Sequence, residues 1–270
     1  HTEVVFIDSL YSNFIKTGFK AYLIMLNEGK TTGGYKKADD ILNAITETQN
    51  RYGSEVMLSD NKIDAEILYN KYDIFKSLFS WYLYVSTILF IVLIVQIFNR
   101  NRVVNSIVTF SKYVTYFLFG IHALGLIARW YISGHAPWSD GYESMIYVAW
   151  ATMLFGIYFG KKSDLALAST TFVTSMILMI PHWSWMDPAI ANLVPVLDSY
   201  WLMIHVAVIV GSYGPFTISM ILGIVSLILM ILANKSNKEI LGINIKELVL
   251  INEMSMTIGL VMLTIGNFLG

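Results

Sequence analysis

Residues 80–99, SWYLYVSTILFIVLIVQIFN, form an apolar run without a charged side chain. A helix needs about 20 such residues to cross the roughly 30 Å hydrocarbon core of a bilayer. Along the rest of the chain, further stretches of this character follow, at about 108–131, 143–160, 164–181, 200–233 and 247–269. The sequence therefore predicts an all-α integral membrane protein with about six transmembrane helices.

The composition of the whole chain agrees with this class. Of its 270 residues, 56% are hydrophobic and only 14% are charged, whereas a soluble domain carries about a quarter charged residues. The net charge is −1, so the chain has no excess of basic residues of the kind that nucleic-acid-binding proteins use, and we expect no nucleic acid partner. The chain has no cysteine, which excludes disulfides, thiolate metal sites and covalent haem attachment through its own CxxCH motif.

The first 79 residues are more polar than the rest. YKKADDILNAITETQNRYG, residues 35–53, predicts an amphipathic helix that stops at Gly53. LSDNKIDAEILYNKYDIFKSL, residues 58–78, predicts a second helix with Ser59 or Asp60 as its N-cap. We therefore expect two domains, a small water-side helical segment at 1–79 and a transmembrane domain at 80–270.

Basic residues are distributed unevenly between the predicted loops. They gather in alternate connections, as Arg100, Arg102, Lys161, Lys162, Lys235, Lys238 and Lys246. The two remaining loops, 132–142 and 182–199, contain no lysine or arginine. Because basic residues collect on the cytoplasmic side, we expect these two loops and the N-terminal segment to be extracytoplasmic.

Both predicted outer loops are rich in aromatic residues. The aromatic candidates for ligand binding are Trp138, Tyr142, Trp183, Trp185 and Trp201. An aromatic belt at the membrane interface is the simplest interpretation, because such rings have an apolar body and a polar edge. The basic loops, 100–107, 161–163 and 234–246, contain no aromatic residue. This asymmetry favours an outer surface for a flat, apolar ligand.

Three ionisable residues fall within predicted helices. His205 lies about one and a half turns inside the outer end of its helix, at a depth that suits an axial ligand of haem iron, although a structural role is commoner on spacing alone. His122 is either a functional intramembrane group or a neutral imidazole bonded to a backbone carbonyl. Glu253 needs a partner or a protonated state at its depth.

Other polar residues of the outer loops have structural interpretations. Glu143 and Asp198 each stand near the start of a predicted helix, where a carboxylate caps or complements the N-terminus. His135 and His182 lie at the interface, where a hydrogen-bonded structural histidine is the usual role.

RWYISGHAPWSDGYESMIYVAW, residues 129–150, resembles the first outer loop of the System II cytochrome c biogenesis protein CcsA, also called ResC. SWMDPAIANLVPVLDSYWLMIHVAVIVGSYG, residues 184–214, and INEMSMTIGLVMLTIGNFLG, residues 251–270, resemble later blocks of that family. Residues 36–71 are similar to the segment that precedes CcsA in CcsBA-type fusions to a ResB-type partner. The resemblance implies a fragment that ends before the family's haem-binding WWD motif.

By this resemblance, the complete protein brings haem b to the outer face of the bacterial inner membrane and presents it to the CxxCH motif of an apocytochrome c. The parent protein would be a cytochrome c synthase with holocytochrome c haem-lyase activity, of which this chain alone is an incomplete part. His205 matches the family's first outer haem-ligating histidine. The implied partners are haem, apocytochrome c, a ResB/CcsB-like partner or fused domain, and the lipid bilayer.

Two other functional classes stay open. A membrane transporter for another small solute would have broken helices with polar groups in mid-membrane. His122, Glu253 and the Gly214-Pro215 pair, which should kink or loosen the fifth helix, offer some of this pattern. A purely structural assembly subunit would have an outer surface without concentrated aromatic residues, and the tryptophan-rich loops argue against it.

Overall fold

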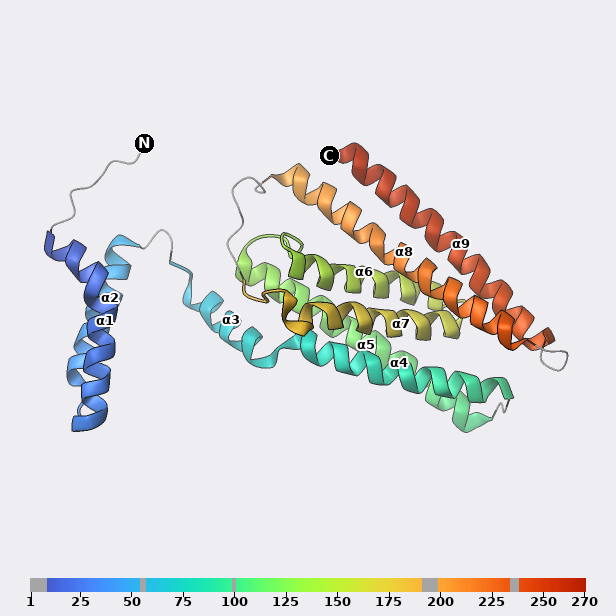
Figure 1. The fold of residues 1–270 in the computed structure, drawn as a ribbon, viewed down its shortest axis with the longest axis horizontal. Coiled ribbons are helices and arrows are strands. Elements are labelled where there is room, and N and C mark those ends of the chain that lie inside the picture. The colour runs from blue at the N-terminus through green and yellow to red at the C-terminus, as the bar shows by residue number, and fades with distance from the viewer. Residues whose placement is uncertain (1–8, 54–56, 99–100, 191–198, 234–237) are drawn as a thin grey trace. The chain divides into compact units, whose positions relative to one another are not determined.

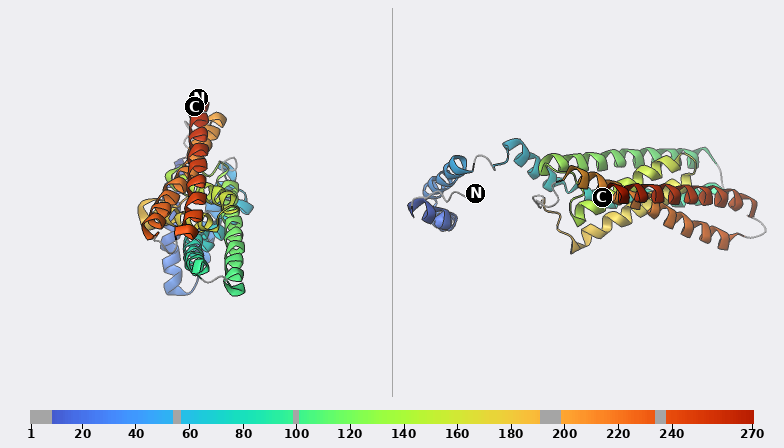
Figure 2. Two further views of the ribbon diagram at one scale, coloured as in Figure 1. Left: turned by 90° about the vertical axis from the view of Figure 1, so that its right-hand side faces the viewer. Right: turned by 90° about the horizontal axis from the view of Figure 1, so that it is seen from above.

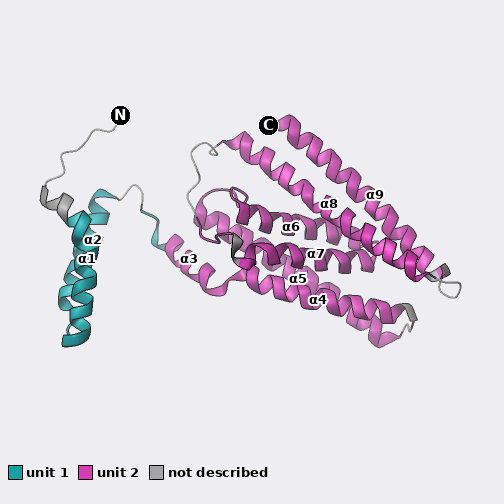
Figure 3. Cartoon of the chain, viewed as in Figure 1, with its two compact units in different colours: residues 1–60 teal, residues 61–270 magenta. Residues whose placement is uncertain are grey.

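The computed structural model describes residues 9–53, 57–98, 101–190, 199–233 and 238–270. Within these ranges the regular structure is helical and no β-strand occurs (Figure 1, Figure 2), which confirms the predicted all-α class. The chain divides into two compact units, residues 1–60 and 61–270 (Figure 3). The predicted division at 79/80 separates water-side from membrane residues, and it stays a prediction.

The first unit is a pair of packed helices, α1 (Ser9–Thr32) and α2 (Lys36–Tyr52). Helix α2 confirms the predicted amphipathic helix, with Gly53 as its C-cap. An exposed ion pair joins the two helices near their connection, with Lys37 Nζ 2.9 Å from Glu28 Oε1. Helix α1 was not predicted, because its mixed polar and apolar residues resemble those of the surrounding segment.

The second unit begins with α3 (Asp60–Tyr72), which confirms the helix predicted to start at Ser59 or Asp60. Each predicted transmembrane stretch corresponds to one further helix. These helices are α4 (Ile74–Phe98), α5 (Arg102–Ser133), α6 (Gly141–Gly160), α7 (Asp164–Ile180), α8 (Tyr200–Leu232) and α9 (Lys238–Leu269). A single π-helical turn, η1 (Pro181–Trp185), follows α7.

Among the described residues, five helical segments are long and apolar enough to cross a membrane. They are Asp60–Gln96, Arg102–Ser133, Asp164–Trp183, Tyr200–Leu232 and Leu241–Leu269. Helix α6 is outside this set, since Glu143 and its tyrosines lower its mean hydropathy. It nevertheless packs against both α7 and α8, so it lies within the bundle. The chain is a multi-pass membrane protein.

The core of the second unit contains many hydroxyl groups that bond within their own helices. Thr152 on α6 donates to the carbonyl of Val148 at 2.7 Å. On α7, Thr170 donates to Ala166 and Thr171 to Leu167, each at 2.8 Å. These bonds satisfy the hydroxyls locally, so the side chains can be buried in an apolar interface without an external partner.

Helix α8 continues through Pro215 without interruption, although the Gly214-Pro215 pair was expected to kink it or loosen its backbone bonding. Gly214 lies against the α6 backbone, and a Cβ atom added there would be 2.8 Å from the amide nitrogen of Thr152. Glycine at this position therefore permits close packing of α8 on α6.

The helix ends that flank the basic connections share one end of the second unit, and the tryptophan-rich connections lie at the other (Figure 1). Near the basic end, Lys112 Nζ lies 2.6 Å from Asp164 Oδ1 and joins α5 to α7. The opposite end, which we call the aromatic end, holds residues 130–142 and 181–190 and the start of α8. It contains most of the predicted site residues.

Candidate functional site

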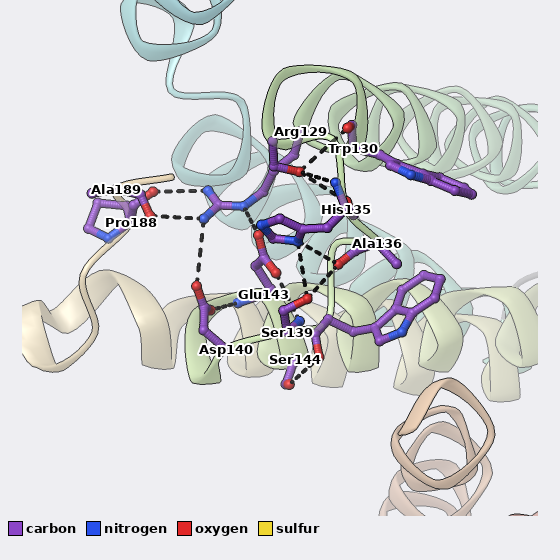
Figure 4. A network of polar contacts seen from close by, with 12 residues as sticks. Arg129, Trp130, His135, Ala136, Ser139, Asp140, Glu143, Ser144, Pro188 and Ala189 are labelled. Carbon is purple, nitrogen blue, oxygen red and sulfur yellow. Dashed lines mark hydrogen bonds and ion pairs between the residues drawn. The ribbon is translucent and has the colours of Figure 1, made fainter. Parts of the chain in front are cut away.

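Arg129, in the last turns of α5, organises the aromatic end. Its side chain is 0% exposed. Nε donates to Glu143 Oε1 at 2.8 Å, while Nη1 and Nη2 donate to the carbonyls of Pro188 and Ala189 at 2.9 and 3.2 Å (Figure 4). One guanidinium thus joins the end of α5, the start of α6 and the segment after η1. We call this set of contacts the Arg129 clamp.

Glu143 is the anionic half of the clamp, and its side chain is 1% exposed. Its second carboxylate oxygen accepts a hydrogen bond from the Ser139 amide at 2.9 Å. Glu143 lies in the first turn of α6, where a carboxylate complements the helix N-terminus as predicted, but it is not the cap: Asp140 is the N-cap and accepts from the Glu143 amide at 2.7 Å. Asp198, the other predicted cap, lies outside the described residues.

Tyr142 is buried beneath the clamp, with the Arg129 guanidinium carbon 4.9 Å from its ring centre. The ring and the Pro188–Ala189 segment also line a cavity of about 290 Å³ with Tyr69 and Asp73. Tyr142 therefore belongs to the wall of the clamp. Its predicted contact with a porphyrin stays a prediction.

Trp138 lies on the other side of the connection between α5 and α6, at a larger cavity of about 510 Å³. Its indole Nε1 donates to the carbonyl of Met203 on α8 at 3.1 Å, and its ring lies 4.9 Å from that of Tyr147. The residues around this Trp138 cavity are largely apolar: Trp130, Gly134, His135, Ala136, Trp138, Ser199, Tyr200, Met203, Ile204, Ala207 and Val208.

His135 stands at the edge of the Trp138 cavity and is tied to its own loop. Its Nδ1 lies 3.1 Å from Ser139 Oγ and 3.2 Å from the Ala136 carbonyl oxygen (Figure 4). This geometry agrees with the interpretation of His135 as a hydrogen-bonded structural histidine.

His205 faces α9. Its Nδ1 lies 2.7 Å from the carbonyl oxygen of Gly266. A carbonyl oxygen can only accept, so Nδ1 carries the proton and the lone pair belongs to Nε2. The ring also packs against Gly270, where an added Cβ atom would collide with it. The hydrogen bond thus holds the imidazole in one orientation and leaves the lone pair on Nε2.

The structure does not gather the predicted aromatic residues on one surface. His205 is absent from the lining of the Trp138 cavity, because successive helical residues point about 100° apart and Ile204 and His205 face different neighbours. Trp201 lies one turn from His205 on the same face of α8. Trp201 and Trp183 are 63% and 68% exposed, and the side chain of Trp185 lies outside the described part.

The two predicted intramembrane polar residues occupy different environments. His122 is fully buried, with Nε2 3.1 Å from the carbonyl oxygen of Ile146 and its ring against Phe75 at 5.4 Å. This is the geometry of a packed imidazole bonded to a carbonyl, one of the two alternatives. Glu253 is exposed on the surface of α9.

The Arg129 clamp was not predicted from the sequence. The charge pattern contained a signal for it, since Arg129 is a basic residue next to a loop that otherwise lacks lysine and arginine. The positive-inside rule makes such a residue exceptional at the predicted outer end. Its carbonyl partners at Pro188 and Ala189 could not be inferred, because they lie about 60 residues further along the chain.

Comparison with known proteins finds a matching protein family and several relatives. A family model described as "Cytochrome C assembly protein" matches residues 138–270. Protein NrfI of Wolinella succinogenes is 39% identical over 236 residues, which cover 87% of this chain and 26% of NrfI. Cytochrome c biogenesis protein CcsA of Olimarabidopsis pumila and of Arabidopsis thaliana is 33% identical over 175 and 177 residues, covering 63% of this chain and 52% of each relative.

The chain thus spans about a quarter of the length of NrfI and about half the length of these CcsA proteins. The matched family region begins at Trp138 and includes the start of α6, both long helices α8 and α9, and His205.

Proposed function

This chain belongs to the cytochrome c assembly protein family, and from that premise we propose that it takes part in cytochrome c maturation by handling haem at its aromatic end. Haem, as haem b, is the substrate, and an apocytochrome c is the acceptor. In the reaction, each thiol of the acceptor's CxxCH motif adds across one vinyl group of haem and forms a thioether. The complete parent protein would be the synthase, working with a ResB/CcsB-like partner or fused domain.

In this proposal the aromatic end faces the extracytoplasmic side of the bacterial inner membrane. The basic residues gather at the opposite end of the second unit, and basic loops are retained in the cytoplasm. The loops 132–142 and 182–199 and the N-terminal segment 1–79 then lie outside, where an apocytochrome c would meet haem.

The observation that carries the proposal is the contact between His205 and Gly266. The 2.7 Å hydrogen bond holds the imidazole by Nδ1, and a second partner of this kind is usual for a histidine that binds metal through its other nitrogen. Histidine is the common axial ligand of haem iron. We therefore assign His205 Nε2 to the iron.

The surroundings of His205 suit a flat apolar ligand. Trp201 lies one turn closer to the aromatic end on the same face of α8, with its indole exposed. Gly270 packs closely against the imidazole, where an added Cβ atom would collide with the ring. In the proposal Trp201 covers one part of the porphyrin and excludes water.

The test uses the full-length protein that contains this chain, purified in detergent from cells with haem. We expect His205→Ala to lose most of the Soret absorbance and to lower the yield of holocytochrome c. Added imidazole should restore part of the absorbance, because it can occupy the vacated ligand position. The matched control is His182→Ala, which removes another histidine of the aromatic end.

The proposal fails if His205→Ala retains the haem content and cytochrome yield of the unaltered protein. A loss of haem that is equal in His205→Ala and His182→Ala, and that imidazole does not reverse, would also contradict it. Protein abundance and melting temperature are measured in parallel, so that unfolding is distinguished from loss of the ligand.

A further inference from the structure

Glu253 lies well inside the apolar part of α9. The last charged residues before it are Lys246 and Glu247, and no charged residue follows it in the helix. About a turn and a half of helix, roughly 9 Å at 1.5 Å per residue, separates Glu253 from Glu247. A glutamate side chain is too short to reach the interface from this depth, unlike the long lysine and arginine side chains.

Helix α9 packs along α8 (Figure 1). Ser255 Oγ donates to the carbonyl of Pro215 at 3.1 Å, and Gly259 lies against the ring of Phe216. Ile251 is buried on this same face. Helical spacing therefore directs Glu253 away from α8.

The outward face of α9 around Glu253 is exposed over several turns. Its members, at helical spacing, are Val249, Glu253, Met256, Thr257, Leu260 and Thr264. We call these residues the Glu253 face. It combines one carboxylate and two hydroxyls with large apolar side chains, unlike the exposed face of α5, where Phe110, Tyr113 and Phe117 are aromatic and uncharged.

The Glu253 carboxylate has neither a hydrogen bond nor an ion pair with the described residues. The hydroxyl of Thr257 donates to the backbone carbonyl of Glu253, at 2.8 Å, and not to its carboxylate. The neighbouring Asn252 amide is already engaged by Ser219 on α8. Because an ionisable group directed into hydrocarbon is costly, such residues normally face protein or water.

We propose that the Glu253 face is the contact surface for a further transmembrane helix, which brings a basic side chain to the Glu253 carboxylate. The exposed methionine, leucine and valine give the incoming helix an apolar surface to pack against, and the carboxylate fixes its register. A cationic partner is the charge complement of this face, since the face supplies one carboxylate and no cation. The inference depends on the membrane character of the chain and not on haem handling.

A second copy of this chain would fit the face less well. Two copies related by a twofold axis would bring two Glu253 carboxylates together, and like charges in a medium of low dielectric repel strongly. The partner helix is therefore expected from another polypeptide segment, with its lysine, arginine or protonated histidine at the depth of Glu253.

The test places a photo-crosslinking amino acid at Leu260 in the full-length protein and irradiates intact membranes. We expect a crosslink to a polypeptide segment, and mass spectrometry of the product should find an apolar helix with a basic residue near the crosslinked site. The control is the same substitution at Phe117, on the exposed face of α5, which should give mainly lipid adducts.

Two crosslinking outcomes would overturn the proposal. One is lipid adducts alone at Leu260, in the same yield as at Phe117. The other is a product with the mass of two identical chains, which would assign the face to a second copy.

Substitution of Glu253 gives an independent measurement. If a basic partner helix packs here, Glu253→Leu should lower the melting temperature in membranes by several degrees and reduce the Leu260 crosslink several-fold, with Glu253→Gln intermediate. If the face meets lipid, Glu253→Leu should instead raise the melting temperature, because it removes an ionisable group from hydrocarbon. An unchanged crosslink in Glu253→Leu would contradict the role assigned to the carboxylate.

Discussion

Arg129 and Glu143 form an ion pair in which Nε lies 2.8 Å from Oε1 and both side chains are almost completely withdrawn from solvent. Burial of two charges is costly unless every polar group finds a partner. Here the remaining guanidinium nitrogens bond to Pro188 and Ala189, and the second carboxylate oxygen accepts from Ser139. The pair therefore holds together the two connections of the aromatic end, and the partners of each group predict the effect of substituting it.

Removal of one charge should be strongly destabilising. We expect Glu143→Leu to lower the free energy of unfolding by about 3–5 kcal/mol, because it removes the hydrogen-bonded anion of the buried Arg129 guanidinium and leaves only the half-exposed Asp140, at 4.0 Å. Differential scanning fluorimetry in detergent measures the shift in melting temperature. Lys112→Leu is the control, since its ion pair with Asp164 is partly exposed and should contribute only about 0–1 kcal/mol. Equal shifts in the two variants would contradict the clamp.

The shape of the guanidinium matters as well as its charge. Arg129→Lys keeps the charge, but one ammonium cannot reach Glu143 and the carbonyls of Pro188 and Ala189 at once. We expect faster amide hydrogen exchange in residues 186–190 and at the start of α6, while exchange in α9 stays unchanged. Protection of residues 186–190 equal to that of the unaltered protein would show that the clamp does not hold this segment.

The indole of Trp138 should contribute through one hydrogen bond. Trp138→Phe removes the five-membered ring of the indole and with it Nε1, which donates to the Met203 carbonyl. We expect a loss of about 1 kcal/mol for the hydrogen bond between uncharged groups, in addition to the packing that is lost with the ring atoms. Trp183→Phe is the matched control, because Trp183 is exposed and surface changes usually stay within about 0.5 kcal/mol. A larger effect at Trp183 than at Trp138 would contradict this role.

The helices were predictable because a long apolar run crosses the membrane. There the backbone finds no water and must form its hydrogen bonds within its own helix. Helix α6 was found by the same pattern despite Glu143, since its remaining residues are mostly apolar. The grouping of the site residues was not predictable. Whether Tyr142 lies under Arg129 or beside a ligand depends on helix rotation and on contacts with Pro188 and Ala189, which local sequence does not encode.

For His205, the depth along its helix could be predicted from the sequence, but the direction of its side chain could not. The sequence placed it near the outer end of a long helix, and the structure has it in α8 near its start. Its direction, toward Gly266 and away from the Trp138 cavity, follows from the packing of α8 on α9. A residue's depth along a helix can be read from its sequence position, but the neighbour that it faces depends on which helices surround it.

The close approach of α8 to α6 gives a test of the bundle itself. Gly214→Ala should lower the free energy of unfolding by about 1–3 kcal/mol, because the added Cβ atom would meet the α6 backbone at Thr152 and backbone atoms cannot move aside as a side chain can. Gly120→Ala, in α5, is the matched control, since no heavy atom lies within 4 Å of its added Cβ. There alanine should be neutral or stabilising by up to about 1 kcal/mol, because it favours the helix over glycine. Thermal unfolding of both variants in the same detergent decides the matter. If Gly214→Ala is as stable as Gly120→Ala, α8 does not approach α6 as closely as the structure has it, and the placement of His205 on the side facing α9 would need revision with it.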